Sequence, residues 1–268
     1  MEILGYIASL AMGVVLGLMG GGGSILTVPI MVYLFGLTPT VATGYSLFIV
    51  GLTAAVGCAM YIRKGEINFK AGILFAAPSI IGVNVSRTFI IPILPNVIGS
   101  IAGFVVTKEI LVMAIFAVLM IVASHSMIGR NKKRKPFETG AVARMILMLL
   151  QGFMVGMVAG FVGAGGGFLI IPALVLFIGL PMRIAIGTSL MIIALQSLMG
   201  FMSDLLRGVS VDWHLLVVVA VFAAVGIVIG SMLAYKVREQ KLKVSFGWFV
   251  LAMGTAILIE QIHQISTK

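Results

Sequence analysis

Hydrophobic residues run along this chain in long stretches, and polar residues are confined to short segments between them. Eight stretches are candidate helices: residues 3–19, 41–62, 71–86, 110–128, 145–162, 184–202, 214–235 and 244–259. Several reach the roughly 20 residues that cross about 30 Å of hydrocarbon in a helix. The pattern predicts an all-α polytopic membrane protein.

Two of the interruptions are rich in glycine. Residues 17–29 read GLMGGGGSILTVP, and residues 160–172 read GFVGAGGGFLIIP. Each break is followed by an apolar segment of 13 residues, 24–36 and 167–179, which as a helix is about 20 Å long and too short to cross a bilayer. We therefore predict two short broken or re-entrant helices, within a total of about 8–10 membrane segments.

The glycine stretches belong to an internal repeat. An offset of 143 residues (172 − 29) aligns Pro29 with Pro172 and, further on, Ser46 with Ser189. Segments 17–53 and 160–196 share 15 identities in 37 positions without a gap, and six of these are glycines. We expect a tandem duplication: a first transmembrane repeat over 1–128, a basic cytoplasmic linker over 129–140 and a second transmembrane repeat over 141–268.

Loop charge favours an inverted repeat over a parallel one. Loop 63–70 carries three basic residues, whereas its counterpart 204–212 carries one basic residue and two acids. Segment 236–243 carries four basic residues. Cytoplasmic loops are the ones enriched in Lys and Arg, and only an inverted arrangement puts 63–70, 129–140 and 236–243 on the cytoplasmic side together.

Composition agrees with a membrane protein. Hydrophobic residues make up 61% of the chain and charged residues 10%, with a mean hydropathy of +1.22, whereas a soluble domain carries about 25% charged residues. The net charge of +10 comes from the basic loops and gives no reason to expect a nucleic-acid partner. The single cysteine, Cys58, lies in an apolar stretch and is expected to be a small buried residue.

A helix that begins at a glycine break has a physical use. The N–H groups of its first turn lack partners within the helix, and glycine lets a ligand approach them without a Cβ in the way. The positive end of the helix dipole favours negative charge, so two facing breaks would form an anion site. The alternative is close helix packing, which we favour for the G-x-x-x-G pairs Gly13–Gly17 and Gly156–Gly160.

Polar residues near the breaks complete the candidate site. Ser24 is expected to cap the first short helix. Ser46 and Ser189 recur in GYSLF and GTSLM, where their hydroxyls either donate to an anion or bond back to their own helix. Gln196 is costly in a membrane helix and is a further donor. The candidate substrate-binding residues are Gly21, Gly22, Gly23, Ser24, Ser46, Gly165, Gly166, Gly167, Ser189 and Gln196.

Charged residues in or near the apolar stretches have two interpretations. An arginine inside a membrane is a functional-site hypothesis by default. Arg87, however, follows the end of an apolar stretch, and we expect its guanidinium to reach the membrane interface. Glu109, Asp204 and Glu260 are the acids considered for a coupling proton.

The sequences GGGGSILTVPIMVYLFGL and AIGTSLMIIALQS, with the duplicated glycine and proline pattern, resemble the TauE/SafE family of sulfite exporters, also called the sulfonate uptake permease group. The resemblance covers essentially the whole chain. It implies a secondary transporter of the cell membrane that moves a small sulfur-containing anion, such as sulfite or a sulfonate, by alternating access with a coupling proton or other ion.

Two other functions stay open: transport of another small organic anion, and a non-transporting membrane partner protein. The exact substrate, the direction of transport, the coupling ion and the oligomeric state are likewise open. An enzyme is not expected, since the sequence has no H-E-x-x-H motif and no carboxylate pair within a helix. No cofactor or metal is expected.

Overall fold

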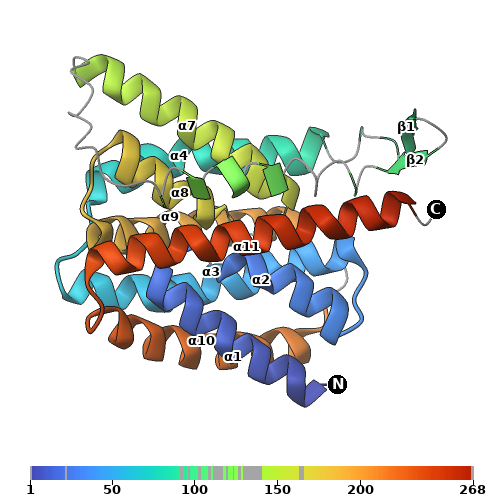
Figure 1. Ribbon diagram of the computed structural model, residues 1–268, viewed down its shortest axis with the longest axis horizontal. Helices are drawn as coiled ribbons and strands as arrows, with labels where there is room; N and C mark the ends of the chain where they lie inside the picture. Colours follow the sequence, from blue (N-terminus) through green and yellow to red (C-terminus); the bar gives the residue numbers. More distant parts are fainter. Residues whose placement is uncertain are drawn as a thin grey trace.

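In a computed structural model, most of the chain forms long helices that pack side by side (Figure 1). The structure describes residues 2–21, 23–90, 141–162, 166–209 and 211–266, together with parts of the segment 93–128. The long helices are α1 (Glu2–Met19), α3 (Pro39–Arg63), α4 (Phe69–Val85), α7 (Ala141–Val162), α9 (Met182–Leu206), α10 (Trp213–Ala234) and α11 (Glu239–Ser266). The predicted helical membrane protein is confirmed.

Seven of the eight predicted stretches coincide with these helices, and 110–128 lies largely outside the described residues. Among the described residues, four helices are long and apolar enough to cross a membrane: Val41–Arg63, Phe69–Ile90, Met182–Leu206 and Trp213–Ala234. Side chains exposed on the helix flanks are often large and apolar, for example Ile73 and Val221, as lipid contact requires.

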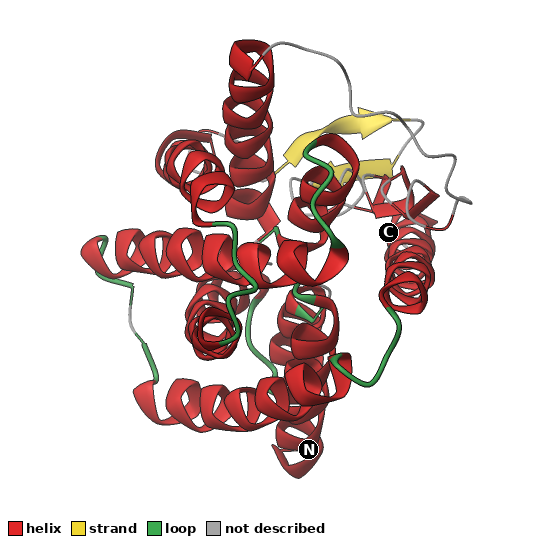
Figure 2. Cartoon of the chain, turned by 90° about the vertical axis from the view of Figure 1, so that its left-hand side faces the viewer, coloured by secondary structure: helices red, strands yellow, loops and turns green. Residues whose placement is uncertain are grey.

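A small β-hairpin departs from the all-α prediction. Strand β1 (Val97–Ile101) pairs antiparallel with β2 (Phe104–Thr107). The hairpin lies near the C-terminal end of α11 (Figure 1), and Figure 2 shows it along the direction of the helices. Pro92 and Pro95 precede it and cannot continue a helix. The β-branched residues that follow, in VIGSI and FVVT, suit strands.

The two glycine breaks are followed by short helices, as predicted. Helix α2 (Ser24–Pro29) continues into the π-helical turn η1 (Ile30–Leu34), and α8 (Gly167–Pro172) continues into η3 (Ala173–Phe177). A third π-helical turn, η2 (Ser86–Ile90), ends α4. The helical parts of the two short segments are thus 24–34 and 167–177, about half the length needed to cross a bilayer.

The long helices pair between the two halves of the chain. Helix α1 packs on α10, α7 packs on α4, and α3 packs on α9. A Cβ added to Gly13 would lie 2.1 Å from the carbonyl oxygen of Ala223, and one added to Gly156 would lie 2.1 Å from that of Ser79. Gly17 and Gly160 approach α10 and α4 in the same way, so the packing interpretation of both G-x-x-x-G pairs is confirmed.

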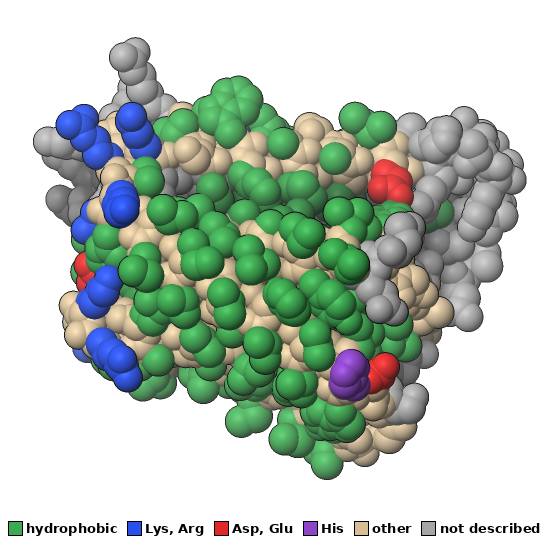
Figure 3. Space-filling model, turned by 90° about the horizontal axis from the view of Figure 1, so that it is seen from below, with side chains coloured by type: hydrophobic (Ala, Val, Ile, Leu, Met, Phe, Trp, Pro, Cys, Tyr) green, Lys and Arg blue, Asp and Glu red, His purple; other side chains and the backbone are tan. Residues whose placement is uncertain are grey.

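Basic side chains gather at one end of the bundle (Figure 3). There the Lys64 ammonium lies 3.2 Å from the centroid of the Tyr235 ring, which brings the loop after α3 next to the turn after α10. The Tyr235 hydroxyl donates to Glu66, and burial, followed by this bond, raises the pKa of Tyr235 well above its usual range. Glu66 also lies against Gly187 near the start of α9, so Arg207, which follows the end of α9, lies at the opposite end of the bundle.

Candidate functional site

The two glycine breaks lie against each other. A Cβ added to Gly21 would lie 2.4 Å from the carbonyl carbon and oxygen of Gly167, and one added to Gly167 would lie 2.6 Å from the Cα of Gly21. Gly20 and Gly166 both adopt left-handed backbone conformations, with φ of +67° and +62°, which glycine tolerates without strain. Two segments 146 residues apart (167 − 21) therefore meet through their backbones.

Close packing accounts for several of the predicted glycines. Gly21 and Gly167 leave no room for a side chain on each other, and a Cβ on Gly23 would lie 2.3 Å from the carbonyl oxygen of Met12. Gly22 and Gly165 lie outside the described residues. The glycines are thus required by backbone contact, whether or not a ligand binds beside them.

The capping role predicted for Ser24 is wrong. Gly23 occupies the N-cap position without a side-chain hydrogen bond, and Ser24 is already inside the first turn. The buried Ser24 hydroxyl donates to the carbonyl oxygen of Gly21 at 2.6 Å. It therefore stabilises the curled backbone of the break instead of accepting from the helix.

The two equivalent serines have different surroundings. The Ser189 hydroxyl, on α9, lies 2.9 Å from the carbonyl oxygen of Gly20 and 2.8 Å from that of Ile186, and it can donate to either. It links the second half of the chain to the first glycine break. The Ser46 hydroxyl, on α3, is buried and has no hydrogen-bond partner.

Gln196 lies against the second glycine break. Its side-chain nitrogen is 3.4 Å from the position of a Cβ on Gly166. Its carbonyl oxygen accepts from the hydroxyl of Ser79 on α4, and both side chains are fully buried. Sequence reasoning missed Ser79 as a partner, because the two residues are 117 positions apart.

The contact between the two glycine breaks, at Gly21 and Gly167, is called the glycine crossing below. Unpartnered hydroxyls lie on the helices around it. In the described part of the chain, Thr27 of α2, Ser46 of α3 and Ser197 of α9 have buried hydroxyl oxygens without a partner, and α3 packs against both α2 and α9. Buried polar groups are nearly always satisfied in folded proteins. Such hydroxyls are chemically suited to donate to a small anion.

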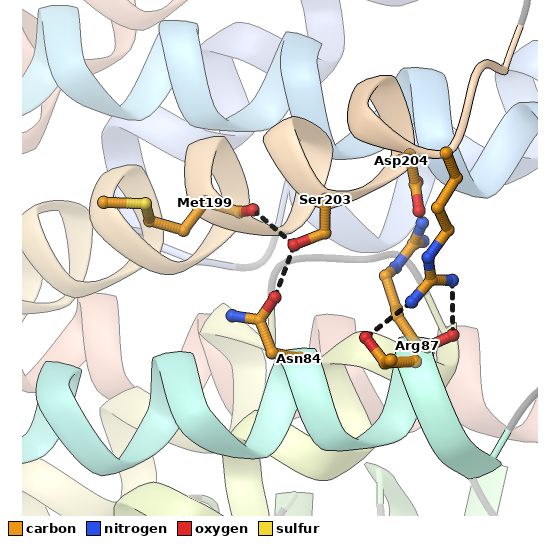
Figure 4. A network of polar contacts seen from close by, with 7 residues as sticks. Asn84, Arg87, Met199, Ser203 and Asp204 are labelled. Atoms are coloured by element: carbon orange, nitrogen blue, oxygen red, sulfur yellow. Dashed lines mark hydrogen bonds and ion pairs between the residues drawn. The ribbon is translucent and has the colours of Figure 1, made fainter.

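A second polar network joins α4 to α9 (Figure 4). Arg87 forms an ion pair with Asp204, and the Arg87 side chain is 6% exposed. The expectation that Arg87 reaches the membrane interface is therefore wrong. The carboxylate fits because Gly44 on α3 has no side chain: a Cβ there would lie 3.2 Å from Asp204 Oδ2. The pairing follows from the high cost of an isolated buried charge.

Neighbouring residues extend this network. Arg207 donates to the carbonyl oxygen of Arg87 at 2.6 Å and to the hydroxyl of Thr88. The Ser203 hydroxyl donates to the side-chain oxygen of Asn84 (Figure 4). Sequence reasoning considered Arg87 and Asp204 separately and missed their pairing, although an opposite charge in another apolar helix is the expected partner of a buried arginine.

Comparison with known proteins identifies the class. Residues 5–257 match the family model of the sulfite exporter TauE/SafE. With its several membrane-spanning helices, the chain is a multi-pass membrane transporter. It belongs to the TauE/SafE family, so the resemblance seen in the sequence is confirmed.

Individual relatives of this chain are also described as membrane transporters. A protein of Xylella fastidiosa is 30% identical over 251 residues, which cover 92% of this chain and 90% of the relative. YunE of Bacillus subtilis is 27% identical over 281 residues, which cover 97% of each chain. A protein of Methanocaldococcus jannaschii is 25% identical over 251 residues, covering 89% of this chain and 85% of the relative. Each is described as a probable membrane transporter protein, and none as an enzyme.

Proposed function

We propose that this protein is a secondary transporter of a small sulfur-containing anion, such as sulfite or a sulfonate, which binds where the two glycine breaks meet. The observation that carries the proposal is the backbone contact between Gly21 and Gly167. It brings the starts of α2 and α8 together beside the buried side chains of Ser189 and Gln196 on α9. The family name supports a sulfite-type substrate.

Three kinds of donor serve an anion in this arrangement. The first turn of a helix carries backbone N–H groups that the helix itself does not satisfy, and both short helices present their positive ends at the breaks. Ser24, Leu26 and Leu169 already donate their N–H groups to Gly21, Gly23 and Gly166, so an anion would use the other first-turn N–H groups. The unpartnered Ser46 hydroxyl adds a neutral donor. Gln196 supplies an amide beside Gly166. Neutral donors and helix ends suit an anion that must also be released, since they hold it without a fixed opposite charge.

We also propose that the two halves form an inverted repeat. The packing of α1 on α10 corresponds to that of α7 on α4 under the 143-residue offset, and both pairs meet through glycines. Glu66, in the loop after α3, bonds to Tyr235 after α10, whereas Arg207, just after α9, bonds to Arg87 at the end of α4. These equivalent loops lie at opposite ends of the bundle, which supports inversion and alternating access by one half rocking against the other.

Reporter fusions test the inverted arrangement. A reporter fused after residue 240 is expected to give a cytoplasmic signal, and one fused after residue 207 an extracytoplasmic signal, because basic loops remain on the cytoplasmic side. A fusion after residue 66 serves as the control and should match the one after 240. A cytoplasmic signal at 207 would exclude the inverted repeat.

Ligand-dependent thermal unfolding in neutral detergent tests the binding site. Sulfite, thiosulfate, small sulfonates, sulfate, acetate and simple cations are compared with wild type, Ser46→Ala and Ser189→Ala. A ligand at 100 times its Kd stabilises the folded state by about 2.7 kcal/mol. We expect a sulfur anion to raise the unfolding temperature of the wild type and to do so much less in the serine variants.

Ser9→Ala is the matched control, because the buried Ser9 hydroxyl donates to Gly5 within its own helix. It should respond to sulfur anions like the wild type. Stabilisation by acetate alone would favour an organic anion as substrate, and stabilisation by cations alone would refute the anion site. Uptake of the stabilising anion into proteoliposomes then separates a transporter, with or without a coupling proton gradient, from a non-transporting partner protein.

A further inference from the structure

The network around Arg87 is not neutral. Two arginines, Arg87 and Arg207, and one carboxylate, Asp204, are connected by the contacts described above. Two positive charges and one negative charge leave one excess positive charge. Arg87 is almost completely buried within the candidate membrane span Phe69–Ile90, where an unbalanced charge is expensive.

The Arg87 guanidinium also has donor capacity to spare. A guanidinium carries five N–H donors. One nitrogen, Nη1, binds Asp204, but the buried Nε has no hydrogen-bond partner. The hydroxyl of the adjacent Ser86 is likewise buried and unpartnered. Both residues lie on the π-helical turn η2, a distortion that is frequent at functional sites.

We propose that Arg87, with Arg207 nearby, binds a small monovalent oxyanion at this end of the transporter. This inference rests on the proposed function, since the ligand is the same class of anion that we assign to the glycine crossing. One such anion neutralises the excess charge. The planar guanidinium is the protein group best matched to an oxyanion with two oxygens.

Among the residues that the structure describes, the Arg87–Asp204 pair has no counterpart at the equivalent position of the other half. At the 143-residue offset, Asp204 corresponds to Tyr61, whose ring packs beside Gly187 as Asp204 packs beside Gly44. The end with Tyr61 carries the basic loops, and the Arg87 end lies opposite. Arg87 therefore binds the anion on the side away from the basic loops, apart from the crossing of the glycine breaks.

Equilibrium binding of labelled sulfite and of acetate to lipid-free protein in neutral detergent tests this. Asp204→Asn removes the carboxylate that competes for Arg87, so the anion should bind at least 10-fold more tightly than to wild type. The neutral double variant Arg87→Gln/Asp204→Asn keeps the fold without a buried charge, and it should bind at least 10-fold more weakly. Lys70→Gln, which removes an exposed charge at the other end, should leave binding unchanged.

The outcomes separate this inference from the proposed function. Sulfite binding with the same Kd in wild type and the double variant overturns the Arg87 site and leaves the glycine crossing intact. Acetate binding that depends on Arg87, without any sulfite binding, supports the Arg87 site and overturns the sulfur substrate. Absence of any anion binding to wild type overturns both. If Asp204→Asn does not fold, the comparison of wild type with the double variant still shows whether anion binding depends on Arg87.

Discussion

Alanine at Gly21 is expected to lower the thermal unfolding temperature of the detergent-purified protein by roughly 6–12 °C. The new Cβ would lie 2.4 Å from the carbonyl carbon and oxygen of Gly167, backbone atoms that cannot rotate away. Overpacking costs about 1–3 kcal/mol, and a rigid neighbour puts Gly21 at the upper end. For a chain of this size 1 kcal/mol corresponds to roughly 2–4 °C. Ligand binding should weaken as well, because the two breaks would be pushed apart.

Gly72→Ala is the control for this experiment. A Cβ at Gly72 would meet the terminal methyl group of Met191 at 2.0 Å, but that group belongs to a flexible side chain that can turn aside. We expect a loss of less than about 1 kcal/mol, measured in the same thermal scan. Equal losses in Gly21→Ala and Gly72→Ala would contradict the backbone contact between the breaks.

Replacing one partner of the buried ion pair should lower the free energy of unfolding more than replacing both partners. Asp204→Ala leaves the Arg87 charge buried and unpaired, and this typically destabilises a protein by about 3–5 kcal/mol. Replacing both partners by apolar residues, Arg87→Met with Asp204→Leu, leaves no charge and should recover most of that loss. Thermal or denaturant unfolding in buffer without added oxyanions measures both variants.

Arg207→Gln is the control for the pair. Arg207 is exposed and bonds to the backbone of Arg87, so its loss should cost no more than about 1 kcal/mol. A double variant that is as unstable as Asp204→Ala would show that Arg87 and Asp204 do not act as a pair.

Local features of this fold can be read from the sequence. The positions of the long helices follow from their apolar stretches, and the two short helices follow from the glycine breaks. The G-x-x-x-G spacing at Gly13 and Gly17 correctly indicated tight packing. Each of these is decided by residues within a few turns of one another, so one chain without relatives suffices.

Long-range contacts could not be read in this way. Nothing local indicates that Gly21 meets Gly167 or that the Ser189 hydroxyl reaches the carbonyl oxygen of Gly20, 169 residues away. The sequence alone favours the interface for Arg87, because Arg87 follows an apolar stretch, and its carboxylate partner lies on a helix of the other half. A pairing of this kind depends on helix packing, which the apolar pattern leaves undetermined.

The error at Ser24 has a different cause. A serine before an apolar run is a good capping candidate, but its role depends on where the first turn begins, and helix boundaries are uncertain by one or two residues. Here the helix begins one residue early, at a position where the Ser24 hydroxyl faces the carbonyl oxygen of Gly21. Because of that shift, the Ser24 hydroxyl does not accept a hydrogen bond from the helix and instead donates one to the glycine break.

Because α1 packs on α10, α1 is synthesised and inserted long before its packing partner exists. Gly13 and Ala223, which meet in the folded protein, are 210 residues apart in the chain (223 − 13). A ribosome adds about 5–20 residues per second, so roughly 10–40 s pass between the synthesis of the two. During that interval lipid or the insertion machinery must cover the glycine face of α1, and the first half of the protein waits in the membrane for the second.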